Sequence, residues 1–265
     1  MTTSRITIRT FCEGRVTAVE ACSDRTFSRH THEEYGIGLI TAGAQRSWSG
    51  RGTVEAAVGG IITVNPGEAH DGAPIGEMRA WNMLYLAPEL VAEYVLDITE
   101  GSTAAFEFSL PAFNNRATAQ RFAKANAAMR KPASRAAEMS ADLITLLAGV
   151  LEPGSASLRG SPPGIRLAKA SIDDDPVGNH SLEALARTSG LSKFQTIRGF
   201  ARSTGLTPHA YVVQRRLDFA RRLIREHAML ADVACAAGFA DQSHLNRAFR
   251  QRYGLTPGCY AAALR

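Results

Sequence analysis

The spacing of hydrophobic residues changes between the first 90 residues and those that follow. Short β-type runs broken by glycines occupy residues 16–22, 35–41, 60–64 and 78–85. From Pro88 onward the pattern becomes helical, over residues 88–96, 117–130 and 132–151. This order predicts an α+β chain that begins with a small antiparallel β-barrel over residues 1–90. A helical segment over residues 91–152 follows, and helices packed outside a barrel could hold two subunits together.

A cluster of Pro, Gly and Ser separates this region from the rest of the chain. Residues 152–164 read EPGSASLRGSPPG, which suits a linker. We therefore predict a linker at 153–164 and an all-α domain over 165–265. The balance of charged residues also changes at this point. Residues 1–163 hold 15 Lys+Arg and 17 Asp+Glu, whereas residues 164–265 hold 15 Lys+Arg and 8 Asp+Glu. This basic excess suits a surface that binds phosphate groups, although a solvated basic face would have the same composition.

The C-terminal part contains an internal repeat, in which residues 182–211 match residues 230–260. The offset is 48 residues at the start of the repeat and 49 residues at its end. The matched positions are Ala186 with Ala234, Gly190 with Gly238, Arg198 with Arg247, Phe200 with Phe249, and the GLTP segments at Gly205 and Gly254. One extra residue has entered the short connection after Gly238, where a change of length disturbs neither helix.

Each half of the repeat predicts a helix-turn-helix, in which the second helix ends at a glycine. Thr207 and Thr256 each precede a proline, which predicts a helix N-cap followed by proline at the first helical position. Between the two halves, residues 208–226 read as one helix about 28 Å long. Successive major-groove segments on one face of B-DNA lie roughly 34 Å apart. Two reading helices joined by such a rod could therefore enter adjacent grooves.

The repeat also predicts which residues of the second helix in each half point outward. In the second half, an apolar stripe leaves polar residues on the opposite side, and these are Gln242, Ser243, Asn246, Arg247 and Arg250. In the first half, the 49-residue offset predicts that Phe194 and Ile197 point outward, that Thr196 lies opposite Leu245, and that Lys193 and Arg198 supply polar contacts. Gln and Asn can pair with adenine, Arg with guanine, and apolar side chains with thymine methyl groups. The alternative is that Phe194 and Ile197 are ordinary buried residues.

Residues from about 165 to 265 resemble the DNA-binding domain of AraC/XylS-type transcriptional regulators. The stretch DVACAAGFADQSHLNRAFRQRYGLTPGCY, at 232–260, is similar to the signature of that family. The resemblance implies a sequence-specific transcription factor that binds double-stranded DNA as a homodimer, with RNA polymerase as a further partner. It implies that Phe194, Ile197, Arg198, Gln242, Ser243, His244, Asn246 and Arg247 meet bases or phosphates. Thr196 departs from the usual aliphatic residue, and Gly199 lies mid-helix at a cost of about 1 kcal/mol relative to alanine.

Two segments near the N-terminus, RHTH at 29–32 and PGEAH at 66–70, resemble the two cupin motifs. Cupin-type barrels are the usual sensor domain of AraC-type regulators, so the resemblance implies a small-molecule effector bound in the barrel. His30 and His32 point to the same side of a strand, and with His70 they could offer three imidazoles to one Zn, Ni, Cu or Fe ion. Enzymatic cupins place a glutamate four or five residues later, where this chain has Gly36 and Ile37. The histidines could instead hydrogen-bond an organic effector or simply satisfy the barrel interior.

Aromatic residues of the same region could line an effector pocket, since such pockets are mostly apolar with a few placed polar groups. They could equally be plain core. Together with Tyr85, the candidate effector-binding residues are His30, His32, Tyr35, Trp48, His70 and Trp81. Sugars, amino acids, aromatic acids and metals all remain open as effectors.

Composition excludes several other classes of protein. A chain of 265 residues can bury a core without disulfides, and its four cysteines form no CxxC pair. The longest apolar run is far short of the roughly 20 residues that span a bilayer, and no secretory signal is evident. We therefore expect a cytoplasmic regulator with no membrane partner, no catalytic residues and no cofactor, unless the barrel histidines bind a divalent metal. The alternatives are a metal-dependent cupin enzyme with a basic appendage and a metal-sensing regulator.

Overall fold

The computed structural model describes residues 4–129, 136–151 and 162–264, which form two compact units. The first unit comprises Met1–Thr26, His32–Gly67 and Gly72–Ala156. The second unit comprises Phe27–Thr31, Glu68–Asp71 and Ser157–Arg265. The predicted linker at 153–164 lies mostly outside the described residues, and its last two residues already belong to a helix.

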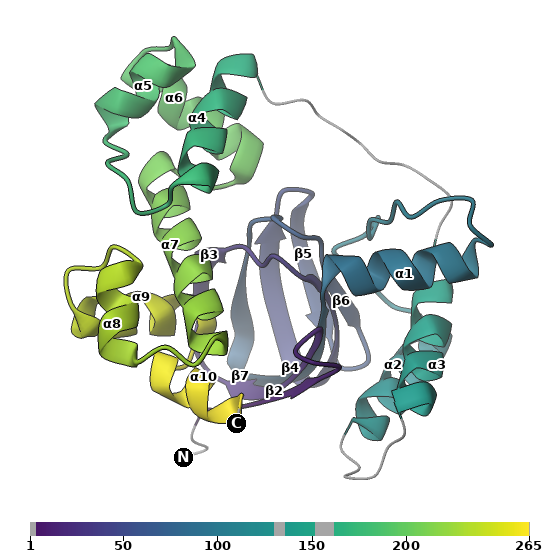
Figure 1. The fold of residues 1–265 in the computed structure, drawn as a ribbon. Coiled ribbons are helices and arrows are strands. Elements are labelled where there is room, and N and C mark those ends of the chain that lie inside the picture. Colours follow the sequence, from purple (N-terminus) through teal and green to yellow (C-terminus); the bar gives the residue numbers. More distant parts are fainter. Residues whose placement is uncertain (1–3, 130–135, 152–161, 265) are drawn as a thin grey trace. The chain divides into compact units, whose positions relative to one another are not determined.

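An antiparallel sheet of eight strands forms the first half of the chain (Figure 1). Its strands are β1 (Arg5–Phe11), β2 (Val16–Ser23), β3 (Phe27–His30), β4 (Tyr35–Ser49), β5 (Gly52–Ala57), β6 (Ile61–Val64), β7 (His70–Leu86) and β8 (Ala112–Phe113). The hydrogen-bonded order is β1-β2-β7-β4-β6-β8, with β3 on β7 and β5 on β4. Among the described strands this path does not return to β1, so the predicted cupin-like barrel is present as an open sheet.

The long strands β4 and β7 are neighbours, and both extend well beyond the predicted runs 35–41 and 78–85. Gly43 lies within β4 with a positive φ of 66°. A Cβ atom at this position would stand 2.3 Å from the carbonyl oxygen of Met78 in β7. Only glycine permits this close approach of the two backbones. A glycine that suggested the end of a strand therefore allows the strand to continue.

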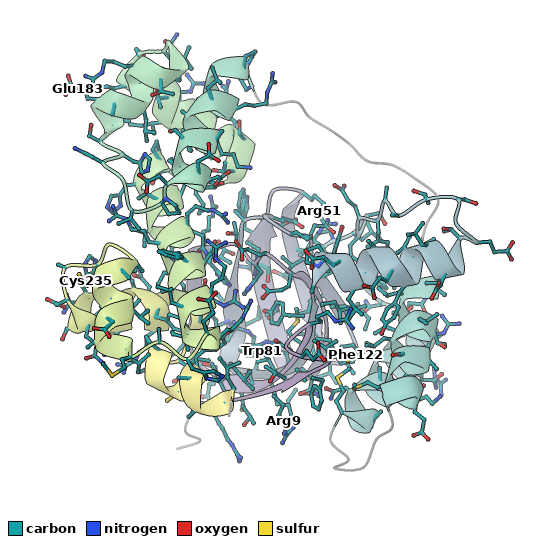
Figure 2. The ribbon with its side chains drawn as sticks, viewed as in Figure 1. Arg9, Arg51, Trp81, Phe122, Glu183 and Cys235 are labelled. Carbon is teal, nitrogen blue, oxygen red and sulfur yellow. The ribbon has the colours of Figure 1, made fainter. Side chains whose placement is uncertain are left out.

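The side chains of the sheet divide between two apolar clusters because successive strand residues point to opposite faces. Leu84 and Leu86 of β7 belong to the cluster that includes three helices, whereas Met83 belongs to the other cluster. The helices are α1 (Pro88–Ile98), α2 (Arg116–Ala128) and α3 (Ala136–Ala148). Phe122 of α2, labelled in Figure 2, is fully buried in the helix-covered cluster. The predicted helical segment thus completes the core of the sheet.

One short strand comes from the segment that the sequence assigned to helices. β8 pairs with β6, with Ile61 opposite Phe113. Just before β8, the carbonyl oxygen of Pro111 accepts a hydrogen bond of 3.0 Å from the Thr63 backbone N–H. The sheet therefore extends past the predicted boundary at residue 90.

The rest of the described chain is helical, as predicted. The helices are α4 (Pro163–Asp174), α5 (Leu182–Ser189), α6 (Lys193–Thr204), α7 (Pro208–Arg225), α8 (Leu230–Ala236), α9 (Gln242–Tyr253) and α10 (Pro257–Ala263). Side-chain hydroxyls of Thr207 and Thr256 cap α7 and α10, and a proline follows each cap as the sequence predicts. Within the described ranges, no helix combines the length and the apolar character needed to cross a membrane.

Candidate DNA-binding surface and sensor site

Two helix-turn-helix units are present in the C-terminal part, at the positions that the repeat predicts. In the first, α5 ends at Gly190 in the left-handed conformation, and α6 begins at a capping box. The Ser192 hydroxyl accepts the Gln195 backbone N–H at 3.2 Å, and the Gln195 side-chain oxygen accepts the Ser192 backbone N–H at 3.0 Å. The start and direction of α6 are therefore fixed by local bonds.

The second unit repeats this plan with α8 and α9. Gly238 has a φ of 74° in the turn, and the Asp241 carboxylate caps α9 by accepting the His244 backbone N–H at 2.6 Å. Both α6 and α9 end at left-handed glycines, Gly205 and Gly254. Matching glycines in the sequence thus mark matching backbone geometry.

The inward side of each second helix confirms the register of the repeat. Thr196 and Leu245, which the 49-residue offset places opposite each other, are both fully buried. The Thr196 hydroxyl donates to the carbonyl oxygen of Ser192 at 2.9 Å and lies 3.1 Å from the buried hydroxyl of Ser189. These bonds explain how a hydroxyl takes the place of an aliphatic side chain, because a buried polar group must be hydrogen-bonded.

Gly199, the other departure in α6, permits a close helix contact. A Cβ atom at this position would stand 2.4 Å from the Cδ1 atom of Ile165 in α4, and Ile165 is fully buried. Gly164 makes a similar approach, since its Cβ would stand 2.0 Å from the carbonyl oxygen of Ser189. Two glycines therefore let α4 pack closely against the first helix-turn-helix.

The outward sides of α6 and α9 differ in chemistry. Phe194 is 65% exposed and Ile197 is 36% exposed, so the prediction that they point outward is confirmed. The guanidinium of Arg198 lies 5.4 Å from the centre of the Phe194 ring. None of the other predicted DNA-contact residues is buried, and these are Lys193, Arg198, Gln242, Ser243, His244, Asn246 and Arg247. Their contact with DNA stays a prediction.

Arg216 of α7 joins the turn of the second helix-turn-helix unit to the segment just ahead of the first unit. Its Nε donates to the carbonyl oxygen of Pro176, ahead of the first unit, at 3.0 Å. Its Nη1 donates at 2.9 Å to the carbonyl oxygen of Gly238, in the turn of the second unit. The sequence reasoning missed this role, because backbone carbonyls leave no signal in the sequence. Arg216 thus fixes the second turn to a segment that precedes the first unit.

Two aspartates anchor α7 to the helices on either side. Asp173 of α4 accepts the Tyr211 hydroxyl at 2.6 Å and pairs with Arg215 at 3.0 Å. The buried carboxylate of Asp218 accepts the Tyr253 hydroxyl of α9 at 3.2 Å and the Arg215 guanidinium at 3.2 Å. Breaking a buried, hydrogen-bonded charge pair is expensive. α7 is therefore bonded to α4 through Asp173 and to α9 through Asp218.

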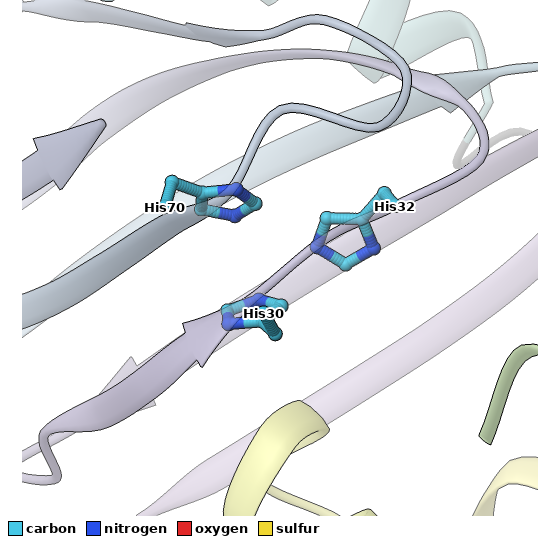
Figure 3. A group of neighbouring side chains, drawn as sticks. All are labelled: His30, His32 and His70. Carbon is cyan, nitrogen blue, oxygen red and sulfur yellow. The ribbon is translucent and has the colours of Figure 1, made fainter. Parts of the chain in front are cut away.

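Three histidines gather where β3 ends and β7 begins (Figure 3). His30 is the last residue of β3, His70 is the first residue of β7, and β3 pairs with β7. His32 lies just beyond the end of β3 rather than on the strand. The ring centroids of His30 and His70 are 4.4 Å apart, and one ligating nitrogen from each of the three residues lies within 4.8 Å of the others. The predicted grouping is confirmed.

Hydrogen bonds and burial define the state of these rings. The Nδ1 atoms of His30 and His70 lie 2.8 Å and 3.1 Å from the carbonyl oxygens of Ser28 and Glu68. Burial lowers the pKa of His30 well below its ordinary value, and the neighbouring His70 lowers this pKa further. Burial also lowers the pKa of His70. Both imidazoles are therefore neutral at pH 7.

The predicted effector residues do not all share one face of the sheet. The hydroxyl of Tyr85 lies 3.3 Å from Nε2 of His32, and Trp81 packs in the same apolar cluster as Tyr85. Tyr35 packs in the opposite, helix-covered cluster. Trp48 follows Gln45 and Ser47 on β4 and points away from them by strand alternation. The structure thus brings the histidines together with Tyr85, places Trp81 in the cluster of Tyr85, and leaves Tyr35 and Trp48 apart.

A buried arginine, not considered from the sequence, lies beside Trp81. Arg79 is 2% exposed, donates to the Gln45 side-chain oxygen at 3.0 Å and to the carbonyl oxygen of Gly72 at 3.2 Å. Its guanidinium lies 4.7 Å from the centre of the Trp81 ring. Burial lowers the pKa of Arg79 to about 10, so the side chain is still charged at pH 7. This face of the sheet therefore combines apolar side chains with a positive charge.

An antiparallel sheet that packs against helices, followed by two helix-turn-helix units, is the architecture of a transcription regulator that carries a sensor domain and a DNA-binding domain in one chain. Residues 13–147 match the AraC-like ligand binding domain, and residues 185–263 match a helix-turn-helix domain. The first match spans more than half of the chain, and the chain belongs to the AraC family. It is a sequence-specific DNA-binding regulator of transcription whose N-terminal domain binds a small-molecule effector.

Individual relatives agree with this assignment. The regulator YbfI of Bacillus subtilis is 24% identical over 83% of this chain and 81% of its own length. LumQ of Photobacterium leiognathi is 38% identical over 32% of this chain, which corresponds to 35% of LumQ. A crystal structure of ToxT from Vibrio cholerae covers all of both chains with a TM-score of 0.57 at 10% identity. That likeness shows the fold of the whole chain.

Proposed function

We propose that α6 and α9 are the two recognition helices and that they enter successive major-groove segments of one operator. The observation that carries this proposal is the match between the two outward faces. In both units the residues at equivalent positions lie outside the core, on helices whose ends are fixed by the same kinds of cap. A side chain can contact a base edge only if it is exposed on the protein surface.

The two helices are proposed to read DNA by different contacts. In α9, Arg247 suits guanine, Gln242 and Asn246 suit adenine, and Ser243 and His244 suit phosphate or base edges. In α6, Phe194 and Ile197 suit the methyl groups of thymine. Lys193 and Arg198 of α6 supply charge for phosphates, since both are exposed. The 18 residues of α7, about 27 Å at 1.5 Å per residue, set the separation.

The regulator is further proposed to act without catalysis, in the cytoplasm, as a homodimer that works with RNA polymerase. The alternative of a cupin enzyme has no support from the relatives, which are regulators of transcription. For the effector we favour the face of the sheet that carries Tyr85, Trp81 and the histidines, because it joins apolar area to polar groups. An effector regulates by binding one arrangement of the protein more tightly than another.

Selection of bound duplexes from a pool of random DNA sequences, followed by footprinting, tests whether α6 and α9 recognise DNA as proposed. We expect two half-sites about one helical turn apart, contacted from one face of the duplex. Arg247→Ala should weaken binding to the selected site by about 1–3 kcal/mol, which is about 5- to 150-fold. Arg46→Ala is the matched control, because it removes an exposed arginine that pairs with Glu55 on the sheet. A single half-site would show that only one of the two helices reads the operator, and equal affinities of the two variants would show that α9 is not a recognition helix.

A further inference from the structure

We propose that β1 is the contact between two copies of this chain, in which the two β1 strands pair antiparallel and join two sheets into one. Among the described strands, β1 stands at one end of the hydrogen-bonded path and pairs with β2 alone. No residue of β1 is buried, whereas β2, the next strand, carries buried residues. The outer edge of β1 therefore offers N–H and C=O groups to a further strand. The inference rests on the homodimer of the proposed function and assigns it a surface.

The sequence of β1 suits pairing with a further strand. Edge strands are often protected by a proline, a bulge or charged side chains. β1 reads RITIRTF, without Pro or Gly, and all of its residues except the two arginines are of types that favour strands. Its register with β2 is unbroken from Arg5, opposite Cys22, to Phe11, opposite Val16. β2 thus holds β1 extended as a template of seven residues.

The two arginines select one register for a symmetric pair. A two-fold axis perpendicular to the sheet keeps each face continuous and sets residues of the same face opposite each other. Pairing about Ile8 engages all seven residues of β1. The opposed residues are then Ile8 with its own copy, Thr7 with Arg9, Ile6 with Thr10, and Arg5 with Phe11. Pairing about Thr7 would set Arg5 against Arg9, and like charges directly opposite each other are destabilising.

The pairing about Ile8 accommodates both positive charges. Arg9 forms an ion pair with Glu20 of β2, with its Nη1 atom 2.8 Å from the carboxylate, so its charge is balanced within its own chain. Arg5 stands opposite the ring of Phe11, and a guanidinium is attracted to an aromatic face. The two copies of Ile8 form an apolar cross-strand pair on the axis. The charges of β1 therefore suit a second copy of the same strand.

Cysteine cross-linking of the full-length protein under mild oxidation tests the contact and its register. Opposite Cα atoms of an antiparallel pair lie about 4.5–5.5 Å apart, a distance that a disulfide spans. Ile8→Cys should therefore give a covalent dimer. Ile6→Cys is the matched control, because both residues are half-buried and the two copies of residue 6 would be about 14 Å apart along the strand. This control should cross-link no faster than the parent protein, which has the same natural cysteines.

A pair of lysine variants tests the same contact without oxidation. Ile8→Lys sets two positive charges opposite each other on the axis, whereas Ile6→Lys sets its charge opposite Thr10. Sedimentation equilibrium should show that Ile8→Lys shifts the protein from dimer to monomer and that Ile6→Lys does so less. Equal effects of the two lysines would contradict the pairing about Ile8.

Circular dichroism establishes that each variant is folded. If Ile8→Cys unfolds, the double variant Ile6→Cys/Thr10→Cys serves instead, because these two residues stand opposite each other in the two copies. A monomeric parent protein overturns both this contact and the proposed homodimer. A dimeric parent protein in which the expected cross-link does not form overturns only the contact through β1, since another surface then holds the dimer. Neither result bears on the proposed recognition helices.

Discussion

The two helix-turn-helix units have one backbone plan but present different surfaces to solvent. The outward side of α6 carries Phe194 and Ile197, whereas that of α9 carries Gln242 and Arg247. Hydrogen bonds to base edges discriminate strongly between bases, and an apolar contact recognises little more than the thymine methyl group. The comparison teaches that two units with the same backbone fold can be suited to different roles in DNA binding. The second unit is suited to specify sequence, and the first is suited to add area and charge.

The largest expected effect concerns what the units share. Phe200 and Phe249 occupy matching core positions and are both essentially unexposed. Replacing either by alanine should lower the free energy of unfolding by about 3–5 kcal/mol, because each leaves a cavity. Urea unfolding followed by the helical circular dichroism signal measures both variants. If one unit tolerates its change and the other does not, the two cores are not equivalent.

The next effect concerns α4, which packs closely against the second helix of the first unit. Gly199→Ala should destabilise the protein by about 1–3 kcal/mol through its clash with Ile165, less the gain of about 1 kcal/mol in helix propensity. The matching residue of the second unit is already Ala248. Combining Gly199→Ala with Ile165→Ala, which removes both of the clashing carbon atoms of Ile165, should cost less than the sum of the two changes. Simple additivity of the unfolding free energies would mean that no clash exists.

A smaller effect tests the difference between the outward faces. Replacing thymine by uracil in the operator removes only the C5 methyl groups. In the half-site of α6 this should weaken binding by about 0.8 kcal/mol for each contacted methyl group, and it should matter less in the half-site of α9. Phe194→Ala should reduce the sensitivity to uracil in the first half-site, and replacing both Phe194 and Ile197 by alanine should abolish it. Equal sensitivity of both half-sites would remove the proposed division of tasks.

The smallest expected effect belongs to the exposed ion pair between Lys193 and Glu183. Their charged atoms are 3.6 Å apart, and both side chains are more than half exposed. Figure 2 labels Glu183 on α5. Glu183→Gln should therefore change the free energy of unfolding by no more than about 0.5 kcal/mol. It should slightly strengthen DNA binding at low salt, because Lys193 is then available to phosphate, and salt titrations of the parent and variant proteins measure this.

The sequence predicted the features that local patterns encode. Capping threonines, turn glycines and the offset of the repeat placed α7 and showed that Thr196, rather than Phe194, is buried. The resemblance to the two cupin motifs also grouped His30, His32 and His70, although His32 lies just beyond the end of the strand on which it was expected. Such features follow from periodicity and from backbone conformations that few residues adopt.

The remaining features depend on contacts between distant segments. Nothing near Gly43 or Gly199 in the sequence reveals that another backbone or side chain approaches there. The burial of Arg79 and the contacts of Arg216 rely on backbone carbonyls, which every residue has. The effector residues were only partly predicted, since strand alternation after Gly43 places Trp48 on the face opposite to Arg79.

The length of α7, the helix of 18 residues between the two helix-turn-helix units, has a mechanical consequence for the operator. A connection of about 27 Å that cannot stretch is shorter than the roughly 34 Å pitch of straight B-DNA. We therefore expect the duplex to bend toward the protein, at an elastic cost of order 1–6 kcal/mol that depends on base sequence. Flexible TA or CA steps between the half-sites would lower that cost. Selectivity would then extend to base pairs that no side chain touches.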